Sequence, residues 1–160
     1  MGYLRRILRE QLDRRFVFGL TLGPTSMTVW MHDRSGVIGT KTAIDIHRVG
    51  ETGICEVAAF TLLPPEKLGF DPTTKLLVAS NQAIPSYTPT VEFVEAYKAA
   101  PYNRRWVIKM NSGKEYVTVR TVSFVQAGFM RGRGPIVWVV VPYGEGNQES
   151  ESKVTRLLNF

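Results

Sequence analysis

Two short segments with strand composition are joined by only four residues, and this spacing constrains the fold more than any other feature. Residues 16–22 and 27–33 are rich in Val, Phe, Thr and Trp, which favour β-strands. The linker at 23–26, Gly-Pro-Thr-Ser, has the composition of a hairpin turn. We therefore predict that the two segments pair as antiparallel strands.

Further turns and strands are predicted downstream of this hairpin. At 33–36, Asp-Arg-Ser-Gly predicts a second turn, because the Asp33 carboxylate can accept a hydrogen bond from the backbone two residues on. The run at 136–141 is β-branched or aromatic throughout, which is typical of a central strand covered on both faces. The strands predicted beyond the hairpin are 37–47, 76–78, 106–110, 115–127 and 136–141.

The helical signals are fewer. Apolar residues at helical spacing predict a helix at 3–15 with arginines on its outer face. The apolar segment 54–63 ends at two prolines and favours a buried helix, with a strand as the alternative. One further turn is predicted at 65–69, and a helix at 91–100 ends before Pro101. A last amphipathic stretch at 154–158 is expected to dock as a C-terminal turn.

These elements together predict an α+β fold. We expect a mostly antiparallel sheet of about five to seven strands with two or three helices. A chain of 160 residues is long enough to bury a core of its own, so residues 1–160 are expected to form a single domain.

The composition limits which cellular compartment and which kinds of partner we expect for this protein. Twenty Lys and Arg against fourteen Asp and Glu give a net charge of +6, which favours anionic partners. The single cysteine, Cys55, cannot form an internal disulfide, and a reducing compartment is the simpler interpretation. The chain contains no apolar run long enough for a membrane span and no signal for secretion or lipidation. We expect an intracellular protein, cytoplasmic or nuclear, that does not bind membranes.

Residue types that perform catalysis are sparse in this sequence. No serine lies in a Gly-x-Ser-x-Gly motif, and Cys55 has no basic neighbours that would activate a thiolate. His32 and Asp33 could meet Asp45 and His47 if their strands pair, but the spacing matches no metal-binding motif. We therefore predict no catalytic residues, no metal site and no cofactor.

One turn combines arginines and glycines in a way that could bind an anion. Arg131, Gly132, Arg133 and Gly134 precede the apolar strand, and such a turn can present backbone N–H and guanidinium groups to a phosphate. No third glycine completes Gly-x-Gly-x-x-Gly, and no Gly-Lys-Ser/Thr follows. A plain hairpin turn is therefore the competing interpretation.

The predicted N-terminal helix carries a basic face formed by Arg5, Arg6 and Arg9. This face could lie on nucleic acid, with the tryptophans as stacking rings. The aromatic and basic residues are not interleaved, however, so a solvated helix face is the competing interpretation.

Six short segments between residues 14 and 72 share their order and spacing with a known family. They are RRFVFGLTL at 14–22, MTVW at 27–30, DRSGVIG at 33–39, DIH at 45–47, AAF at 58–60 and LGFDP at 68–72. These segments resemble the region upstream of the catalytic core in fungal-type protein kinases. The resemblance resumes at 129–138, where Gly132, Arg133, Gly134 and Trp138 look like the glycine turn at the start of the kinase lobe. Residues 73–105 show little resemblance to this family.

The resemblance implies a fragment of a larger kinase-like protein. Phosphoryl transfer needs a lysine on the third strand, a glutamate on the next helix, a His-Arg-Asp loop and an Asp-Phe-Gly metal ligand. None of these can be placed, because 26 residues follow Gly134 (160 − 134) and His47-Arg48 is followed by Val49. We therefore expect the chain alone to be inactive as a kinase.

Three functions follow in order of preference. The first is a noncatalytic accessory or regulatory module, acting through contacts with a protein partner or with the remainder of the kinase-like chain. The second is a module for nucleic acid or a phosphorylated ligand, using the basic helix and the turn at 131–134. The third is an enzyme with an unfamiliar site built from His32, Asp33 and His47.

Overall fold

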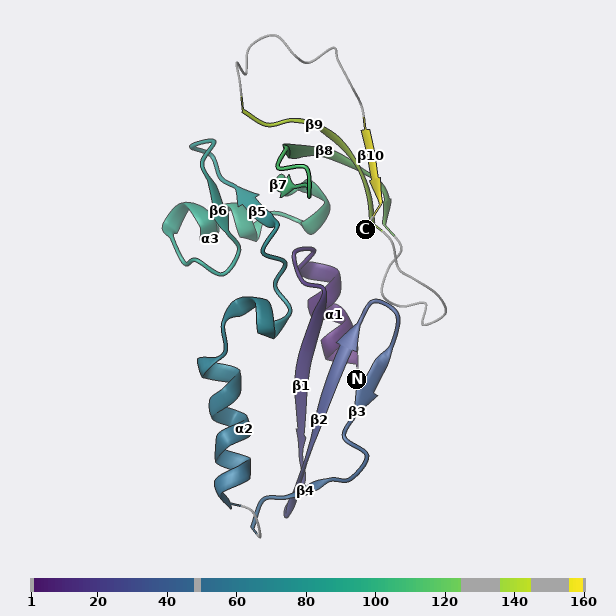
Figure 1. Ribbon diagram of the computed structural model, residues 1–160, viewed down its shortest axis with the longest axis vertical. Coiled ribbons are helices and arrows are strands. Elements are labelled where there is room, and N and C mark those ends of the chain that lie inside the picture. Colours follow the sequence, from purple (N-terminus) through teal and green to yellow (C-terminus); the bar gives the residue numbers. More distant parts are fainter. Residues whose placement is uncertain (1, 48–49, 125–135, 145–155, 160) are drawn as a thin grey trace.

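The computed structural model describes residues 2–47, 50–124, 136–144 and 156–159, and these form three α-helices and ten strands (Figure 1). The strands belong to two antiparallel sheets rather than to the one sheet that we expected. The predicted α+β fold class is confirmed. The first sheet consists of β1 (Phe16–Leu22), β2 (Ser26–Asp33), β3 (Val37–Gly39) and β4 (Ile44–Asp45).

The hairpin predicted from the four-residue linker is confirmed. β1 and β2 pair antiparallel over the full length of β1, from Phe16 opposite Asp33 to Leu22 opposite Met27. The turn between them is closed by a hydrogen bond from the Gly23 N–H to the Ser26 carbonyl, 2.7 Å long.

The continuous strand predicted at 37–47 is wrong. The segment forms two short strands, β3 and β4, and both pair with β2 on the side away from β1. Trp30 pairs with Gly39 and Met27 with Ile44, and the Thr40 N–H still donates to the Val29 carbonyl at 3.0 Å, while the exposed residues 41–43 lie outside the strands. The segment does form strands, as its composition predicted, but these strands pair only near the two ends of β2.

Helix α1 (Gly2–Glu10) packs on one face of the first sheet. Leu8 is fully buried, and the Leu4 side chain fills the space over Gly19 of β1. The helix ends five residues before the boundary at residue 15 that its apolar spacing predicted. The reason is tertiary, because the backbone of the following residues bonds to distant segments, with the Arg15 N–H donating to the Gly69 carbonyl at 2.8 Å.

Helix α2 (Gly50–Leu62) confirms the helical interpretation of the apolar segment before the two prolines. The burial predicted for this helix is wrong, because Val57 is 50% exposed and Leu62 is 82% exposed. A short 3₁₀ helix, η1 (Pro65–Leu68), follows it and ends at Gly69, as the composition at 65–69 predicted. Figure 1 shows α2 standing beside β1, on the side away from β2.

The second sheet has the strand order β10-β9-β8-β7-β5-β6 and holds most of the buried core. Its largest fully buried side chain is Trp106, which packs with Leu76, Ile108 and Val140. The strands are β5 (Thr74–Leu77), β6 (Ala83–Pro85), β7 (Trp106–Lys109), β8 (Glu115–Phe124), β9 (Ile136–Pro142) and β10 (Arg156–Asn159). Residues 125–127 of the strand predicted at 115–127 lie outside the described residues.

Helix α3 (Val91–Lys98) packs against this sheet through Phe93, Ala96 and Tyr97. It begins where Thr90 caps it, with the Thr90 hydroxyl oxygen accepting a hydrogen bond from the Phe93 N–H at 3.0 Å. The short 3₁₀ helix η2 (Pro101–Asn103) follows. The helix predicted at 91–100 is confirmed, two residues shorter at its C-terminal end.

The strand and the turn predicted near the C-terminal end have different outcomes. The all-apolar strand is confirmed, since β9 lies between β8 and β10 and most of its side chains are buried. The turn predicted at 154–158 is wrong where the structure describes it, because residues 156–159 form β10 and pair antiparallel with β9. The apolar spacing there suited a helical turn, but an available strand edge determined the conformation.

Candidate functional site

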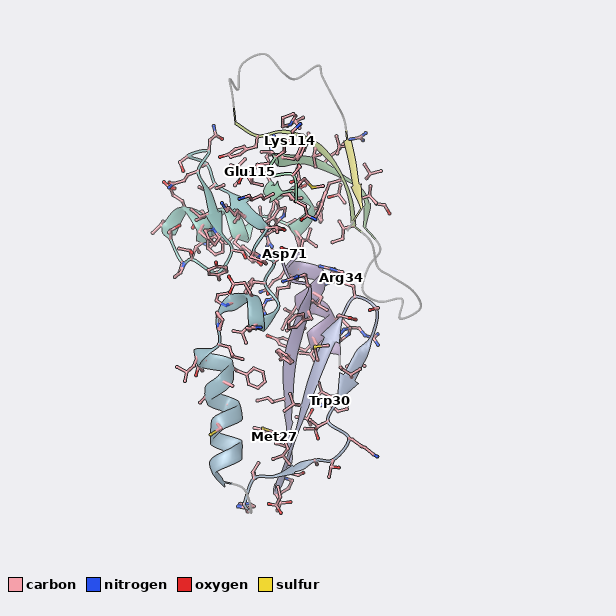
Figure 2. All side chains as sticks on the ribbon, viewed as in Figure 1. Met27, Trp30, Arg34, Asp71, Lys114 and Glu115 are labelled. Carbon is pink, nitrogen blue, oxygen red and sulfur yellow. The ribbon has the colours of Figure 1, made fainter. Side chains whose placement is uncertain are left out.

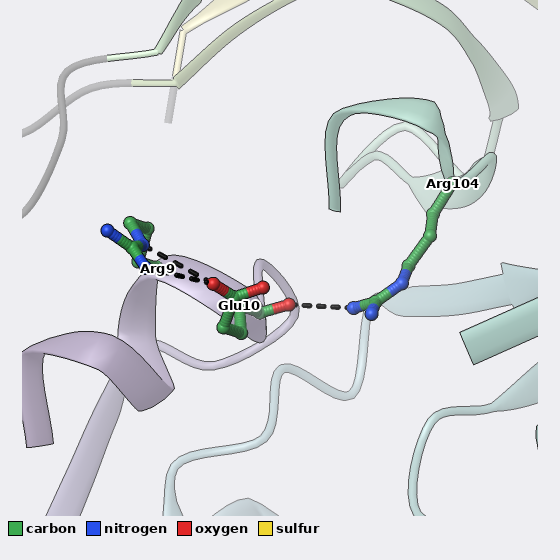
Figure 3. A network of polar contacts seen from close by, with 3 residues as sticks. All are labelled: Arg9, Glu10 and Arg104. Atoms are coloured by element: carbon green, nitrogen blue, oxygen red, sulfur yellow. Dashed lines mark hydrogen bonds and ion pairs between the residues drawn. The ribbon is translucent and has the colours of Figure 1, made fainter. Parts of the chain in front are cut away.

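The two parts of the anion site predicted from sequence have different outcomes. Arg131, Gly132, Arg133 and Gly134 lie outside the described residues. On α1, Arg6 and Arg9 are exposed and Arg5 is half-buried. The Arg9 guanidinium lies 3.2 Å from the carboxylate of its neighbour Glu10 (Figure 3), which offsets part of the positive charge of this face.

The histidines proposed for an unfamiliar enzyme site lie far apart. His32 is buried near the end of β2, and its Nδ1 lies 2.6 Å from the Asp33 carbonyl oxygen. His47 is exposed and follows β4, which pairs with the opposite end of β2 at Ser26. The six residue steps from Ser26 to His32 along β2 span about 20 Å. Within the described part of the chain, no three His, Cys, Asp or Glu residues are placed to hold a metal ion.

Asp33 closes the turn at 33–36, as its sequence context predicted. Its Oδ1 accepts hydrogen bonds from the Ser35 N–H at 2.8 Å, the Ser35 hydroxyl at 2.8 Å and the Gly36 N–H at 2.7 Å. Partial burial alone would raise the pKa of Asp33, but the bonds from Ser35 and Gly36 outweigh it and hold the pKa below its ordinary value.

Replacing Asp33 by alanine is therefore expected to lower the free energy of unfolding by roughly 1 kcal/mol, because the Gly36 and Ser35 donors lose their acceptor. Since the folded-state pKa is lowered, this contribution is present above the unfolded-state pKa and is lost as the pH falls through the folded-state value. Urea unfolding of the parent and the variant at neutral and at acid pH measures both the loss of stability and its pH dependence. If Asp33→Ala and the parent were equally stable at neutral pH, the prediction that Asp33 stabilises the turn would be wrong.

A polar cluster that sequence reasoning missed joins the two sheets. Asp13, just after α1, is 1% exposed, and the Tyr97 hydroxyl of α3 donates to its Oδ1 at 3.2 Å. Its backbone carbonyl accepts a hydrogen bond from the Asp71 N–H at 2.8 Å. Arg104 donates to the Glu10 carbonyl at 2.7 Å (Figure 3) and stacks 4.0 Å over the Tyr97 ring. We call Asp13, Arg14, Arg34, Tyr97 and Arg104 the junction cluster.

The charges in the junction cluster influence one another. Burial raises the pKa of Asp13, while Ser86, Tyr97 and Arg14 oppose the rise. Burial also raises the pKa of Tyr97, and the nearby Asp13 charge adds to that shift. Figure 2 places Arg34 and Asp71 at this boundary between the sheets. No local sequence pattern indicated the cluster, because Asp13 and Tyr97 are 84 residues apart.

An apolar groove lies between β1 and α2. It has a volume of about 440 Å³, and the rings of Phe18 and Phe60 meet across it with centroids 5.5 Å apart. The Arg14 guanidinium lies at one end of it. The lining residues are Arg14, Phe18, Gly19, Leu20, Val57, Phe60, Thr61 and Leu68.

The first sheet also has an apolar face that α1 does not cover. Partners across an antiparallel ladder lie on the same face, so the register places several apolar side chains together on the face opposite to Val17 and His32. Leu22 is 67% exposed and Ile38 is 63% exposed. On this face Met27 is buried and Phe18 packs against Phe60 of α2, so we call the remaining residues the open face: Phe16, Leu20, Leu22, Val29, Met31, Ile38 and Ile44.

Comparison with known families gives one clear result. The family model described as fungal protein kinase matches residues 1–149, which is nearly the whole chain and includes the stretch 73–105 that contributed little to the resemblance. Curated proteins and solved structures gave no match. None of the described helices has the length and apolar character needed to cross a membrane. On the extent of the family match, the chain belongs to the fungal protein kinase family.

Proposed function

We propose that this chain is a noncatalytic accessory or regulatory module of the fungal protein kinase type, acting through protein contacts. The observation that carries this proposal is the open face. β1 and β2 carry apolar residues on both faces, a composition typical of strands that are covered on both sides. Among the described residues, α1 covers one face and Phe60 of α2 packs against Phe18 on the other, which leaves Leu22 and Ile38 of that second face largely exposed. Contiguous exposed apolar surface commonly marks a protein interaction site.

The absence of kinase motifs in the sequence supports the noncatalytic half of the proposal. The His-Arg-Asp and Asp-Phe-Gly motifs do not occur in the 160 residues. Without these groups the chain has neither the aspartate that accepts the substrate proton nor the aspartate that holds magnesium. We expect that the chain, incubated with radiolabelled ATP, Mg²⁺ and a generic protein substrate, transfers no phosphate. Robust transfer would overturn the noncatalytic role.

The contact half is tested with a defined partner, the kinase lobe of a separate fungal protein kinase family member. We expect the chain to bind this lobe and to change its phosphotransfer rate, and we expect Ile38→Lys on the open face to abolish both effects. Val91→Lys is the control, because Val91 is also highly exposed but lies on α3. Loss of binding in the control as well, or no binding by the parent chain, would count against the open face as the contact surface.

The net charge of +6 and the exposed arginines of α1 favour a second candidate, binding of nucleic acid or a phosphorylated ligand. A specific site would make binding fall steeply with salt, because each phosphate contact releases counterions. We expect only weak heparin retention, reduced equally by Arg6→Ala/Arg9→Ala and by the control Lys67→Ala/Lys109→Ala, which removes the same charge from exposed positions elsewhere. A salt dependence that flattens only in the arginine variant would favour this second candidate.

A further inference from the structure

The edge of β1 that faces α2 has open backbone hydrogen-bonding positions. Within the described residues, β1 pairs only with β2. A hydrogen bond from the Arg15 N–H to the Gly69 carbonyl marks the start of this edge, and the described part of the chain provides no backbone partner on that side from Val17 to Leu22. An unpaired strand edge is a template on which another extended segment can add.

The apolar groove described above runs along this edge and is lined on its far side by α2. Phe60 reaches across it to Phe18, while Val57 is 50% exposed and Leu20 is also exposed. A segment lying on the β1 edge would place alternate side chains toward Leu20 and Val57, because side chains alternate along a strand. Backbone pairing would supply affinity and the apolar walls would select the side chains, as in strand addition generally.

The charge at the end of the groove indicates which segment fits. Arg14 is the charged residue of its lining, and the guanidinium stacks 3.9 Å over the Phe70 ring. Its Nη1 makes one long bond of 3.4 Å to the Leu68 carbonyl, and burial lowers the pKa of Arg14 although the nearby Asp13 charge opposes the shift. A carboxylate is the natural partner for such a group. The net charge of +6 favours an acidic partner over a second copy of the chain.

We propose that the groove between β1 and α2 binds an extended, acidic segment of a partner protein, which adds as a strand to the edge of β1. The segment carries apolar side chains at alternate positions and a carboxylate at the Arg14 end. This inference rests on the proposed accessory function, since it names one surface through which the protein contacts would be made, and that surface is separate from Ile38.

The test uses a random dodecapeptide display library selected on the intact chain, with counter-selection on Val57→Lys. We expect enriched peptides with alternating apolar residues and an Asp or Glu near one end. A synthetic copy of an enriched peptide is expected to bind the parent, to lose at least tenfold in affinity for Val57→Lys, and to bind Val94→Lys as it binds the parent. The control matches the test, because Val94 is an exposed valine on another helix, 44% exposed.

Two further variants separate strand addition from nonspecific apolar binding. Methylating alternate backbone nitrogens of the peptide should abolish binding, and replacing its acidic residue by lysine should weaken binding to the parent but not to Arg14→Gln. The proposal is overturned if no peptide discriminates against Val57→Lys, if the methylated peptide binds equally, or if the parent forms a dimer that Val57→Lys abolishes. None of these outcomes affects the phosphate-transfer assay or the binding test with Ile38→Lys. The proposed function is therefore tested independently of this groove.

Discussion

Gly69→Ala is expected to lower the free energy of unfolding by roughly 3 kcal/mol, through left-handed backbone strain and overpacking. Gly69 has φ of +99°, a conformation that side chains rarely adopt. A Cβ at this position would also collide with the carbonyl oxygen of Phe16 in β1, a backbone atom that cannot rotate away. The same residue accepts the hydrogen bond from Arg15, so any shift would disturb the link between η1 and the first sheet.

Two matched variants separate the collision from the strain. Gly113 has φ of +80° with open space around its Cβ position, so Gly113→Ala should show only the left-handed cost of about 1 kcal/mol. Gly36 has no positive φ and open space, so Gly36→Ala should be nearly neutral. Urea unfolding followed by tryptophan fluorescence measures all three. A Gly69→Ala variant no less stable than Gly113→Ala would contradict the steric contact with Phe16.

Asp13→Ala is the second large effect, expected to lower the free energy of unfolding by about 2 kcal/mol. The change leaves the partly buried Tyr97 hydroxyl without its acceptor, and an unsatisfied buried polar group costs about 1–3 kcal/mol. Burial lowers the pKa of Arg14, Arg34 and Arg104, and the change also removes the Asp13 charge that opposes this shift. Tyr97→Phe is the matched control, because it removes the same bond and leaves the carboxylate in place.

The pH dependence of stability distinguishes this role from simple packing. Because burial raises the folded-state pKa of Asp13 above its ordinary value of 3.8, the folded protein binds more protons than the unfolded chain just above that pH. Stability contributed by this group should therefore fall as the pH rises from about 3.8 to the folded-state value. Asp13→Asn should lack this decline. Parallel profiles for the parent and Asp13→Asn would show that the Asp13 carboxyl titrates normally.

Local sequence patterns were sufficient for elements whose partners lie nearby along the chain. The four-residue linker predicted the β1–β2 hairpin, and Asp33 predicted its turn, because turn chemistry acts over two or three residues. The prolines after residue 63 and Pro101 likewise marked where helices end, because proline restricts the local backbone geometry.

Sequence reasoning failed where distant segments compete for the same backbone groups. The end of α1, the division of 37–47 into β3 and β4, and the pairing of β10 with β9 all depend on partners that no local pattern names. The same holds for the candidate sites. Helical spacing was enough to place Arg6 and Arg9 of α1 on an exposed face, but not to predict the burial of Asp13 or the groove beside β1.

The sequence by itself determined the strand composition, the turn chemistry, the positive charge and the family, since each is a property of the residues and their spacing. Tertiary structure alone decided that the strands divide into two sheets and that a charged cluster joins them. It also decided that, among the described residues, one apolar face is partly exposed and the edge of β1 beside α2 has no backbone partner. The physical reason is that burial and backbone pairing are satisfied between segments far apart in the chain, and many alternative pairings satisfy the same local pattern equally well.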